Sequence, residues 1–217
     1  MLYVVSTPIG NLGDMTYRAV EVLKSVDLIA CEDTRRTKIL THHYQVKAPL
    51  TSYYEYNKVI KGEYILKLLK SGKRIALVSD AGTPGISDPG FTLIKSALDA
   101  GVKVVSIPGP TALISALSIS GFPTHRFIFE GFLPAKSGAR KKELNNLKDL
   151  KVTVVLYESP HRILKTLEDM LDVLGNRPIA IVREVTKKFE EVVRGDIKTL
   201  LEKFKASKPK GEFVVIF

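Results

Sequence analysis

Short apolar runs alternate with longer segments of helical periodicity through the first half of the chain. The runs predicted as strands are Leu2–Ser6, Leu28–Cys31, Leu50–Tyr53, Ile75–Val78 and Val102–Ile107. The segments predicted as helices are Thr16–Ser25, Thr34–Tyr44, Glu55–Lys70, Phe91–Ala100 and Thr111–Ser120. Strands that alternate with helices of about 10–15 residues are typical of a parallel sheet with right-handed crossovers. The first half is therefore predicted to be an α/β domain.

The pattern changes after Gly121-Phe122-Pro123. The later runs predicted as strands are Phe127–Glu130, Val152–Tyr157, Ile179–Arg183, Glu190–Arg194 and Glu212–Phe217. The helices predicted between them are a basic segment after the first run, Pro160–Leu174 and Ile197–Phe204. Two of these strands lack a long crossover of the kind seen in the first half, so a mixed sheet is predicted. We expect two α/β domains, at residues 1–118 and 119–217.

Composition and charge narrow the class of protein without deciding it. The 217 residues carry a formal net charge of +10, and 45% of them are hydrophobic. These values fit a globular protein, and the length falls short of the ~250 residues of a (β/α)₈ barrel. The positive charge is spread along the chain, so it fits either a nucleic-acid partner or a lysine-rich solvated surface.

Other features of the sequence bear on where the protein is found in the cell and on whether it binds a metal. The single cysteine, Cys31, lies in an apolar run and is expected to be a buried thiol. The chain start has no basic segment typical of a signal peptide, and no run reaches the ~20 apolar residues of a membrane span. We expect a cytoplasmic protein without a membrane partner. No histidine has another ligand at metal-binding spacing, so no metal site is predicted.

Three predicted strands of the first half end in loops rich in glycine and proline. These loops are residues 6–14, 79–90 and 108–111. Glycine lets a backbone approach a ligand closely, and proline stiffens the loop around it. Because ligands of open α/β sheets bind beyond the carboxyl ends of the strands, we expect a ligand site there rather than three plain turns.

The residues of these loops limit the choice of ligand. Neither a G-x-x-x-x-G-K-[ST] phosphate loop nor a G-x-G-x-x-G fingerprint is present, which disfavours a nucleoside triphosphate or nicotinamide site. The 79–90 loop contains two carboxylates, Asp80 and Asp88, and no cation. This suits a ligand with hydroxyls or positive charge, and S-adenosylmethionine has a ribose diol, an ammonium group, a sulfonium and no phosphate.

Six groups of residues, in order along the chain, carry a family resemblance. They are Thr7-Pro8-Ile9-Gly10-Asn11-Leu12-Gly13-Asp14, Cys31-Glu32-Asp33-Thr34-Arg35, the two halves of the 79–90 loop (Ser79-Asp80-Ala81-Gly82-Thr83-Pro84 and Ser87-Asp88-Pro89-Gly90), Pro108-Gly109-Pro110, Glu130-Gly131-Phe132-Leu133-Pro134 and Tyr157-Glu158-Ser159-Pro160-His161-Arg162. With them the sequence resembles the ribosomal RNA small subunit methyltransferase I family, of the tetrapyrrole-methylase-like class. The resemblance runs from residue 2 to residue 217. Many members continue beyond the last strand with a partly basic helical extension.

The resemblance implies a two-domain α/β fold with a cofactor cleft between the domains, usually in a homodimer. It implies methyl transfer from S-adenosylmethionine to the ribose 2′-hydroxyl of a cytidine in the decoding region of 16S rRNA, with free small-subunit rRNA or the 30S subunit as partner. The cofactor contacts that it implies are Pro8, Asp80, Ala81, Gly82, Thr83, Ile86, Pro108, Gly109 and Pro110, together with Tyr157 and Ala180 on second-domain strands.

Methyl transfer from a sulfonium needs an aligned acceptor oxygen and a base, or a cation, that favours the alkoxide. The candidates are Glu158 and Arg35, followed by Glu32 and His161. A helix that Ser159 caps and Pro160 begins would place His161 in its first turn, where the helix dipole favours the neutral imidazole that a base needs. The alternative for His161 is an ordinary surface histidine.

Basic side chains near predicted loops are candidates for contacts with RNA phosphates. They are Lys136, Arg140, Lys141, Lys142 and Arg36. The alternative for the first four is a solvated helix start. Tyr53, Tyr54 and Tyr56 fit either half-buried packing or stacking on a base.

Two other functions fit the same fold. One is a small-molecule methyltransferase that acts on a tetrapyrrole, and the other is an RNA-binding module without catalytic activity. Copurified pigment would favour the first, and failure to bind S-adenosylmethionine would favour the second.

Overall fold

A computed structural model describes residues 1–217, and the chain divides into two compact units, Met1–Thr111 and Ala112–Phe217. Each unit is built on one five-stranded sheet. The division falls at Thr111, earlier than the proposed boundary at residue 118. The reason is helix α5 (Ala112–Ser120), which packs against strands of the second sheet.

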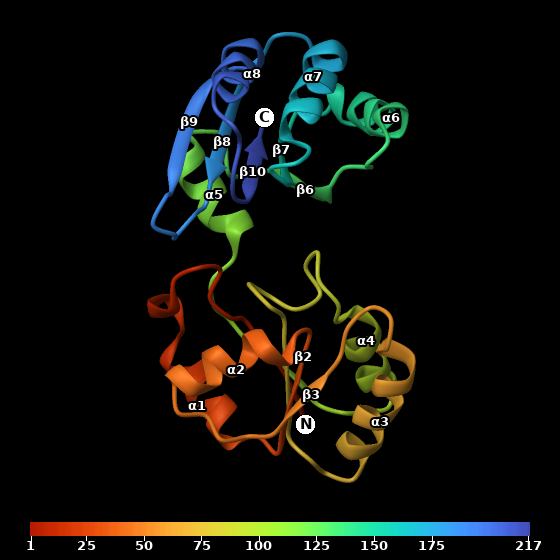
Figure 1. Cartoon of the computed structure of the whole chain (residues 1–217). Helices are drawn as coiled ribbons and strands as arrows, with labels where there is room; N and C mark the ends of the chain where they lie inside the picture. Colours follow the sequence, from red (N-terminus) through yellow and green to blue (C-terminus); the bar gives the residue numbers. More distant parts are fainter. The chain divides into compact units, whose positions relative to one another are not determined.

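The first unit contains the parallel sheet that the apolar runs predict. Its strands are β1 (Leu2–Val5), β2 (Leu28–Cys31), β3 (Leu50–Ser52), β4 (Ile75–Val78) and β5 (Val104–Ile107). They are all parallel, in the order β3-β2-β4-β1-β5. Helices α1 (Tyr17–Ser25) and α2 (Thr34–His43) lie on one side, and α3 (Lys58–Lys70) and α4 (Phe91–Asp99) lie on the other (Figure 1).

Burial explains why the inner strands of this sheet are uninterrupted apolar runs. Every residue of β2 and β4 is buried, because helices cover both faces of the sheet. One core, which includes Ile65 and Leu93, lies under α3 and α4, and a second, which includes Ala19 and Leu23, lies under α1. This leaves the two ends of the strands as the places where polar loops can gather.

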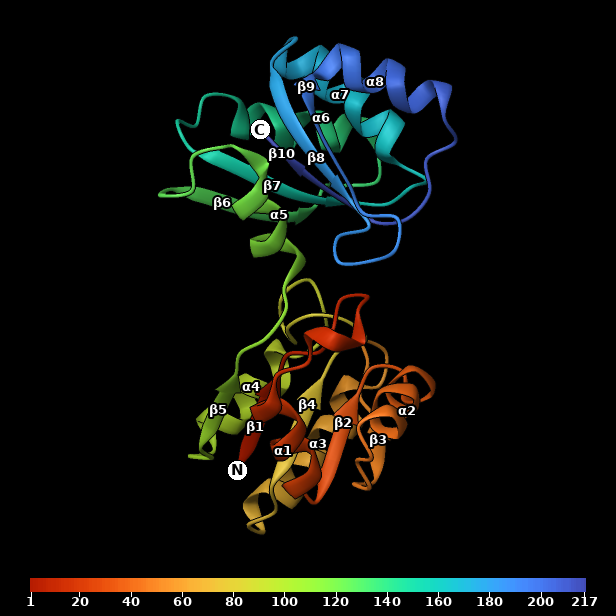
Figure 2. The same cartoon turned by 90° about the vertical axis from the view of Figure 1, so that its left-hand side faces the viewer.

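The second unit contains the predicted mixed sheet. Its strands are β6 (Phe127–Phe132), β7 (Thr153–Glu158), β8 (Pro178–Arg183), β9 (Glu191–Asp196) and β10 (Phe213–Ile216). Their order is β6-β7-β10-β8-β9, and β6 with β7 is the parallel pair. Helices α6 (Ser137–Lys148), α7 (Ile163–Leu174) and α8 (Ile197–Ala206) pack on one face, and α5 packs on the other (Figure 2).

Two helices begin later than their periodicity predicts. The predicted helix at Glu55 begins at Lys58, because the Asn57 side chain holds a turn by accepting the Tyr54 N–H at 2.8 Å. The predicted helix at Pro160 begins at Ile163. The cap position is Arg162, with no side-chain hydrogen bond, and Ser159 takes part through its carbonyl, which accepts the Ile163 N–H at 3.0 Å. The short 3₁₀ helix η1 (Leu12–Asp14) was not predicted. No helix in the chain is both long enough and apolar enough for a bilayer span.

Candidate active site at the carboxyl ends of the parallel strands

The loops after β1 and β4 are joined by backbone hydrogen bonds. Thr7 donates its N–H to the Gly82 carbonyl at 2.9 Å, and Gly82 donates to the Thr7 carbonyl at 3.0 Å. The hydroxyls of Ser6 and Thr83 lie 2.7 Å apart. Two of the three loops that the sequence singled out are therefore one connected structure at the edge of the sheet.

Two glycines permit this close arrangement of loops. Gly82 has a φ of +75°, in the left-handed region that side chains rarely adopt. A Cβ on Gly109 would lie 3.0 Å from the Cβ of Ser6, so the loop after β5 rests directly on the end of β1. All three glycine-proline loops thus meet at the carboxyl ends of neighbouring strands, where open α/β sheets bind ligands.

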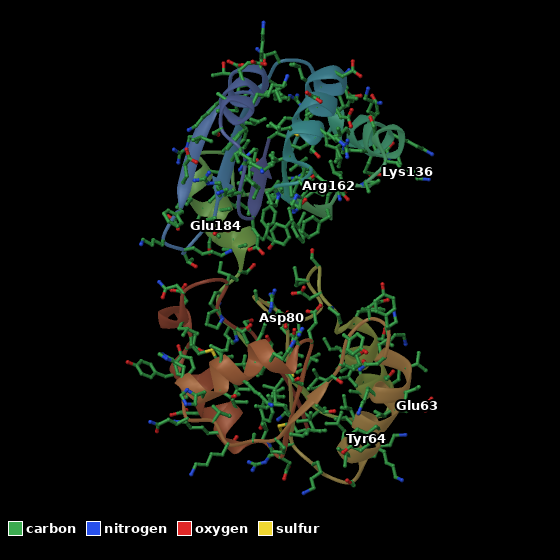
Figure 3. All side chains as sticks on the ribbon, viewed as in Figure 1. Glu63, Tyr64, Asp80, Lys136, Arg162 and Glu184 are labelled. Atoms are coloured by element: carbon green, nitrogen blue, oxygen red, sulfur yellow. The ribbon has the colours of Figure 1, made fainter.

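Asp80 connects the β4 loop to the end of β2. Its Oδ1 accepts the Asp33 N–H at 3.0 Å, and its Oδ2 lies 3.4 Å from the guanidinium of Arg36. Asp80 is partly exposed and is labelled in Figure 3. We call Glu32, Asp33, Arg35, Arg36 and Asp80 the strand-end cluster.

The charges of the strand-end cluster act on one another. Arg35 donates side-chain hydrogen bonds from Nε and Nη2 to the Asp33 carboxylate, and these bonds hold the pKa of that carboxyl at about 2. Burial raises the pKa of Glu32 above its usual value, and the charge of Asp80 adds to this shift. Arg35 is largely exposed, so its guanidinium remains open to a further anionic partner.

The donors and acceptors at this edge fit S-adenosylmethionine. The carboxylates of Glu32, Asp33 and Asp80 suit ribose hydroxyls or an ammonium group, and the apposed loop backbones allow a ring to approach closely. The first-unit residues proposed for the cofactor all lie on the three loops at this edge: Pro8, Asp80, Ala81, Gly82, Thr83, Ile86, Pro108, Gly109 and Pro110. No group of three or more His, Cys, Asp or Glu side chains could hold a metal ion.

The two second-unit candidates for the cofactor lie on different strands. Tyr157 is on β7, partly buried, and its hydroxyl accepts the Leu113 N–H at 3.0 Å. Ala180 is fully buried on β8, and strand β10 separates the two. Both therefore remain proposals for cofactor contact.

Glu158 does not occupy the position of a general base. Its side chain is buried and accepts hydrogen bonds from the Thr166 hydroxyl at 2.6 Å and the Ser159 N–H. Strand alternation places it on the face covered by α6, α7 and α8, opposite Tyr157 on the α5 side. A base must reach the hydroxyl that it deprotonates, so the sequence-based assignment of Glu158 is corrected to a structural one. His161 is exposed in the turn before α7, rather than in the first turn of the helix.

Arg140 is likewise not a phosphate contact. It is buried, and its guanidinium pairs with Asp169 at 2.6 Å and donates to the Ala135 carbonyl at 3.2 Å. Lys141 is paired with Asp172 at 2.7 Å, whereas Lys136 and Lys142 are exposed. Tyr53 is also buried, so it packs in the core and stacks on no base.

These corrections reveal a structure that sequence reasoning missed. Arg140, anchored by Asp169, bonds the carbonyls of Pro134 and Ala135. Arg162, 3.3 Å from Glu158, bonds the carbonyls of Leu133 and Pro134. We call these two ion pairs the loop clamp, because together they fix the backbone between β6 and α6. One signal was available: Arg140, Leu144 and Leu147 follow the helical spacing of a buried face.

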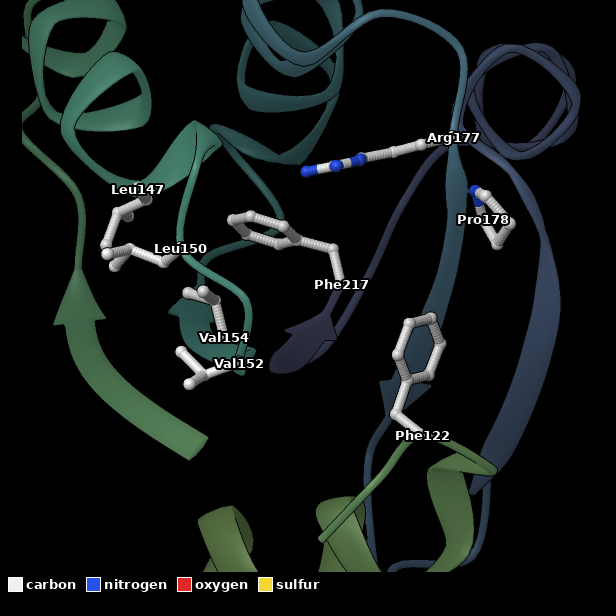
Figure 4. A pocket seen from close by; sticks show the side chains of 8 residues that line it. All are labelled: Phe122, Leu147, Leu150, Val152, Val154, Arg177, Pro178 and Phe217. Atoms are coloured by element: carbon white, nitrogen blue, oxygen red, sulfur yellow. The ribbon is translucent and has the colours of Figure 1, made fainter. Parts of the chain in front are cut away.

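A separate apolar pocket of about 200 Å³ lies in the second unit (Figure 4). Its lining comprises Phe122, Leu147, Leu150, Val152, Val154, Arg177, Pro178 and Phe217. The pocket lies at the start of β7, at the end of the strand opposite to Tyr157 and Glu158. It has one charged side chain, Arg177, and no acid that could act in methyl transfer.

Comparison with known proteins first defines the class. The solved structure of a uroporphyrin-III C-methyltransferase from Thermus thermophilus, complexed with S-adenosylhomocysteine, matches with a TM-score of 0.68 at 18% identity. The match covers 99% of this chain and 96% of that one. The fold is thus that of a class of two-unit α/β methyltransferases.

Sequence comparison then gives the family. The family model of the Tetrapyrrole (Corrin/Porphyrin) Methylases matches residues 1–201. Ribosomal RNA small subunit methyltransferase I of Bacillus subtilis is 50% identical over 216 residues, which are 100% of this chain and 74% of the relative. The Thermotoga maritima protein of the same name is 47% identical, over 99% of this chain and 96% of its own. The chain belongs to the tetrapyrrole methylase family and, within it, to the ribosomal RNA small subunit methyltransferase I proteins.

Proposed function

We propose that this chain transfers a methyl group from S-adenosylmethionine to the ribose 2′-hydroxyl of a cytidine in the decoding region of small-subunit rRNA. The observation that carries the proposal is about 50% identity, over the whole chain, to relatives named as methyltransferases of small-subunit ribosomal RNA. The strand-end cluster supports it, since its carboxylates suit a cationic nucleoside. The tetrapyrrole alternative rests on the name of the broader family and on solved structures at 18% identity, and the latter share the fold alone.

The loops of the first unit would hold the cofactor. When bound, S-adenosylmethionine supplies a methyl group made electrophilic by its sulfonium. Asp80 would bind its hydroxyls or ammonium, while Pro8, Ala81–Thr83, Ile86 and the 108–110 loop would surround it. Tyr157 and Ala180 would add contacts from the second unit. Fixed backbone loops accelerate such a displacement by alignment, because the acceptor oxygen must lie in line with the bond that breaks.

Glu32 is the strand-end residue best suited to accept the proton of the 2′-hydroxyl. Its raised pKa brings it closer to neutrality, where a general base works best. Arg35, exposed beside it, would bind the adjacent phosphate and favour the developing alkoxide. His161 is the second candidate base. We expect Glu32→Gln to lower kcat about 10²–10⁴-fold, and an unchanged kcat would rule out this role.

RNA binding would involve the exposed cations Lys136, Lys142 and Arg36. Lys141 would contribute once an RNA phosphate replaces Asp172 as its partner. Each phosphate contact releases counterions, so binding should weaken steeply with salt. Lys136→Ala with Lys142→Ala should reduce the slope of log K against log[salt] by about 1–2 units. An unchanged slope would exclude this surface. Because the proposed substrate is rRNA or the 30S subunit, the reaction would occur in the cytoplasm.

We also propose a homodimer, through the exposed apolar face of α3. Tyr56 lies just before the helix, and Val59, Ile60 and Tyr64 follow at helical spacing; all four are exposed. Large apolar side chains that are exposed together on one helix are typical of an interaction site. Ile60→Glu should produce monomers in size-exclusion chromatography with light scattering. Ile39→Glu, on exposed α2, is the control, and an Ile60→Glu protein of unchanged mass would refute the interface.

The cofactor is tested by isothermal titration with S-adenosylmethionine. Asp80→Ala should weaken binding about 10–100-fold, since hydrogen bonds to charged groups are lost. Asp99→Ala, which removes an exposed carboxylate of α4, should not change it. Methylation of 30S subunits from a methylation-deficient strain then tests the reaction. No binding by the wild-type chain, or no 2′-O-methylcytidine in the treated rRNA, would refute the proposal.

A further inference from the structure

Aromatic side chains form an exposed row along edge strand β6. Phe127 is 38% exposed and Phe132 is 53% exposed, with Phe129 partly buried between them. Tyr157 of β7 contacts two of them, with its ring centroid 4.8 Å from that of Phe129 and 5.7 Å from that of Phe132. We call Phe127, Phe129, Phe132 and Tyr157 the aromatic row.

A bulge in β6 produces this row. Phe129 pairs with Val155, but Gly131 pairs with Leu156 and Phe132 with Tyr157, so Glu130 is the extra residue. Without it, Phe129 and Phe132 would point to opposite faces of the sheet, because side chains alternate. Gly131, at a φ of +66°, allows the backbone to make the shift. The extra residue therefore gathers the rings on the face opposite α6 and α7.

The loop clamp holds the exposed end of the row in place. Arg162 bonds the carbonyl of Leu133, the residue directly after Phe132, and the Leu133 side chain is itself buried. Tyr157, fixed by the Leu113 N–H, braces the Phe132 ring from the neighbouring strand. The half-exposed Phe132 ring is thus held in place by its neighbours, although it is not part of the hydrophobic core of the second unit.

The charges around the row indicate what covers it. Arg126 precedes β6 and Lys136 follows it, both exposed, against one acid, Glu130, in the bulge. Figure 3 labels Lys136 and Arg162 on the same side of the second unit. A second copy seated on the row would bring its own Arg126 and Lys136 to the same surface, and these like charges would repel. Rings flanked by cations instead fit single-stranded nucleic acid.

We propose that Phe132, supported by Tyr157 and Phe129, is a stacking platform for an unpaired base of the RNA substrate. The proposal rests on the proposed function, and it adds a site in the second unit that neither the loops nor the strand-end cluster provides. Stacking recognises any base through its ring face, so it would hold a splayed strand without selecting the sequence.

The test uses Phe132→Leu, which removes the ring but keeps an apolar side chain. We expect this variant to bind a single-stranded decoding-region RNA oligonucleotide roughly 10–100-fold more weakly, with unchanged affinity for S-adenosylmethionine. The control is Phe189→Leu, which removes an exposed ring in the loop between β8 and β9 and should leave both affinities unchanged. Because the chain has no tryptophan, Phe132→Trp adds a single reporter whose fluorescence should be quenched by the RNA and not by the cofactor.

Each outcome separates this proposal from the others. Unchanged RNA affinity in Phe132→Leu, or no quenching in Phe132→Trp, overturns the platform. Weaker binding of S-adenosylmethionine overturns it in favour of the cofactor's adenine, and loss of the dimer in light scattering overturns it in favour of contact between copies. If RNA quenches the Phe132→Trp variant while the wild-type chain methylates no 30S subunit, the proposed function is refuted and the platform stands.

Discussion

The strand-end cluster and the loop clamp contain nearly the same chemical groups, but the first is available to a ligand and the second stabilises the fold. Each combines aspartate or glutamate with two arginines beside a loop that follows a strand. In the strand-end cluster, Arg35 is 89% exposed and Arg36 is 70% exposed, so their partners compete with water. In the loop clamp, Arg140 is 3% exposed and Glu158 is 1% exposed, and their charges are satisfied inside the protein.

This difference shows what makes a charged group available for chemistry. Glu158 has a hydroxyl, a backbone N–H and a guanidinium as partners, so it has little capacity left for a substrate. Asp80 accepts one backbone N–H and forms a long, exposed ion pair with Arg36. A ligand can take the place of Arg36 in that pair. Exposed pairs contribute little to stability, whereas breaking a buried pair leaves an uncompensated charge. Burial therefore assigns one group to ligand binding and the other to the fold.

The strongest test of the difference between the two clusters is a substitution at Arg140 of the loop clamp. We expect Arg140→Ala to lower the free energy of unfolding by about 3–5 kcal/mol, because Asp169 stays buried without its partner. Thermal unfolding should show the midpoint falling by roughly 6–20 °C at this chain length. Lys141→Ala is the matched control, since Lys141 contacts the same acid from an exposed position and its loss should leave the midpoint nearly unchanged. A small effect in both variants would mean that Arg140 is not a buried structural residue.

Glu158→Gln sharpens the distinction between a structural and a catalytic carboxylate. We expect a loss of about 1–3 kcal/mol in stability, since the glutamine amide keeps one of the two acceptor oxygens and loses the charge that faces Arg162. At a temperature where the variant is folded, kcat and its pH profile should match the wild type.

The opposite result would restore Glu158 as a base. In that case kcat would fall about 10²–10⁴-fold with little change in the unfolding midpoint. Thr166→Val provides an independent check, because it removes a partner of Glu158 without touching the charge and should lower stability alone.

The sequence predicted the elements well and the roles of single residues less well. Strands such as Leu28–Cys31 and Ile75–Val78 agree with the structure to the residue, because a strand buried on both faces is an apolar run with sharp ends. The start of α7 was wrong because Ser159 and Pro160 are typical of a helix start but here form a turn, with the Arg162 N–H bonded to the Ser159 carbonyl.

The predicted roles were wrong or missing where a shift of one position along a strand decides which way a side chain points. Tyr157 and Glu158 are adjacent, yet β7 directs them to opposite faces, and motif similarity does not say which face packs against α6, α7 and α8. Phe132 was not predicted as a site because its exposure depends on an extra residue in β6, which shows only in the register with β7. The strand-end loops were predictable because they depend on backbone shape, which glycine and proline reveal directly.

The smallest expected effect concerns Glu32 and its pH dependence. Burial raises its pKa in the folded protein above the usual 4.5, so the folded state disfavours the ionised form. Its favourable contribution to stability is then fully present below pH 4.5 and is lost as pH rises through the raised pKa. Glu32→Gln, which stays neutral, should be slightly more stable than the wild type at neutral pH, and the gain should vanish once the wild-type carboxyl is protonated.

Glu63→Gln, on the exposed face of α3, is the control for the substitution itself. Urea unfolding of both variants across the acidic to neutral range measures the difference directly. A Glu32→Gln protein less stable than the wild type at neutral pH would mean that ionised Glu32 is held by Arg36. In that case the charges of the strand-end cluster would be neutralised by one another, as those of the loop clamp are. The exposure of Arg35 and Arg36 would then not be enough to make the cluster available to a ligand.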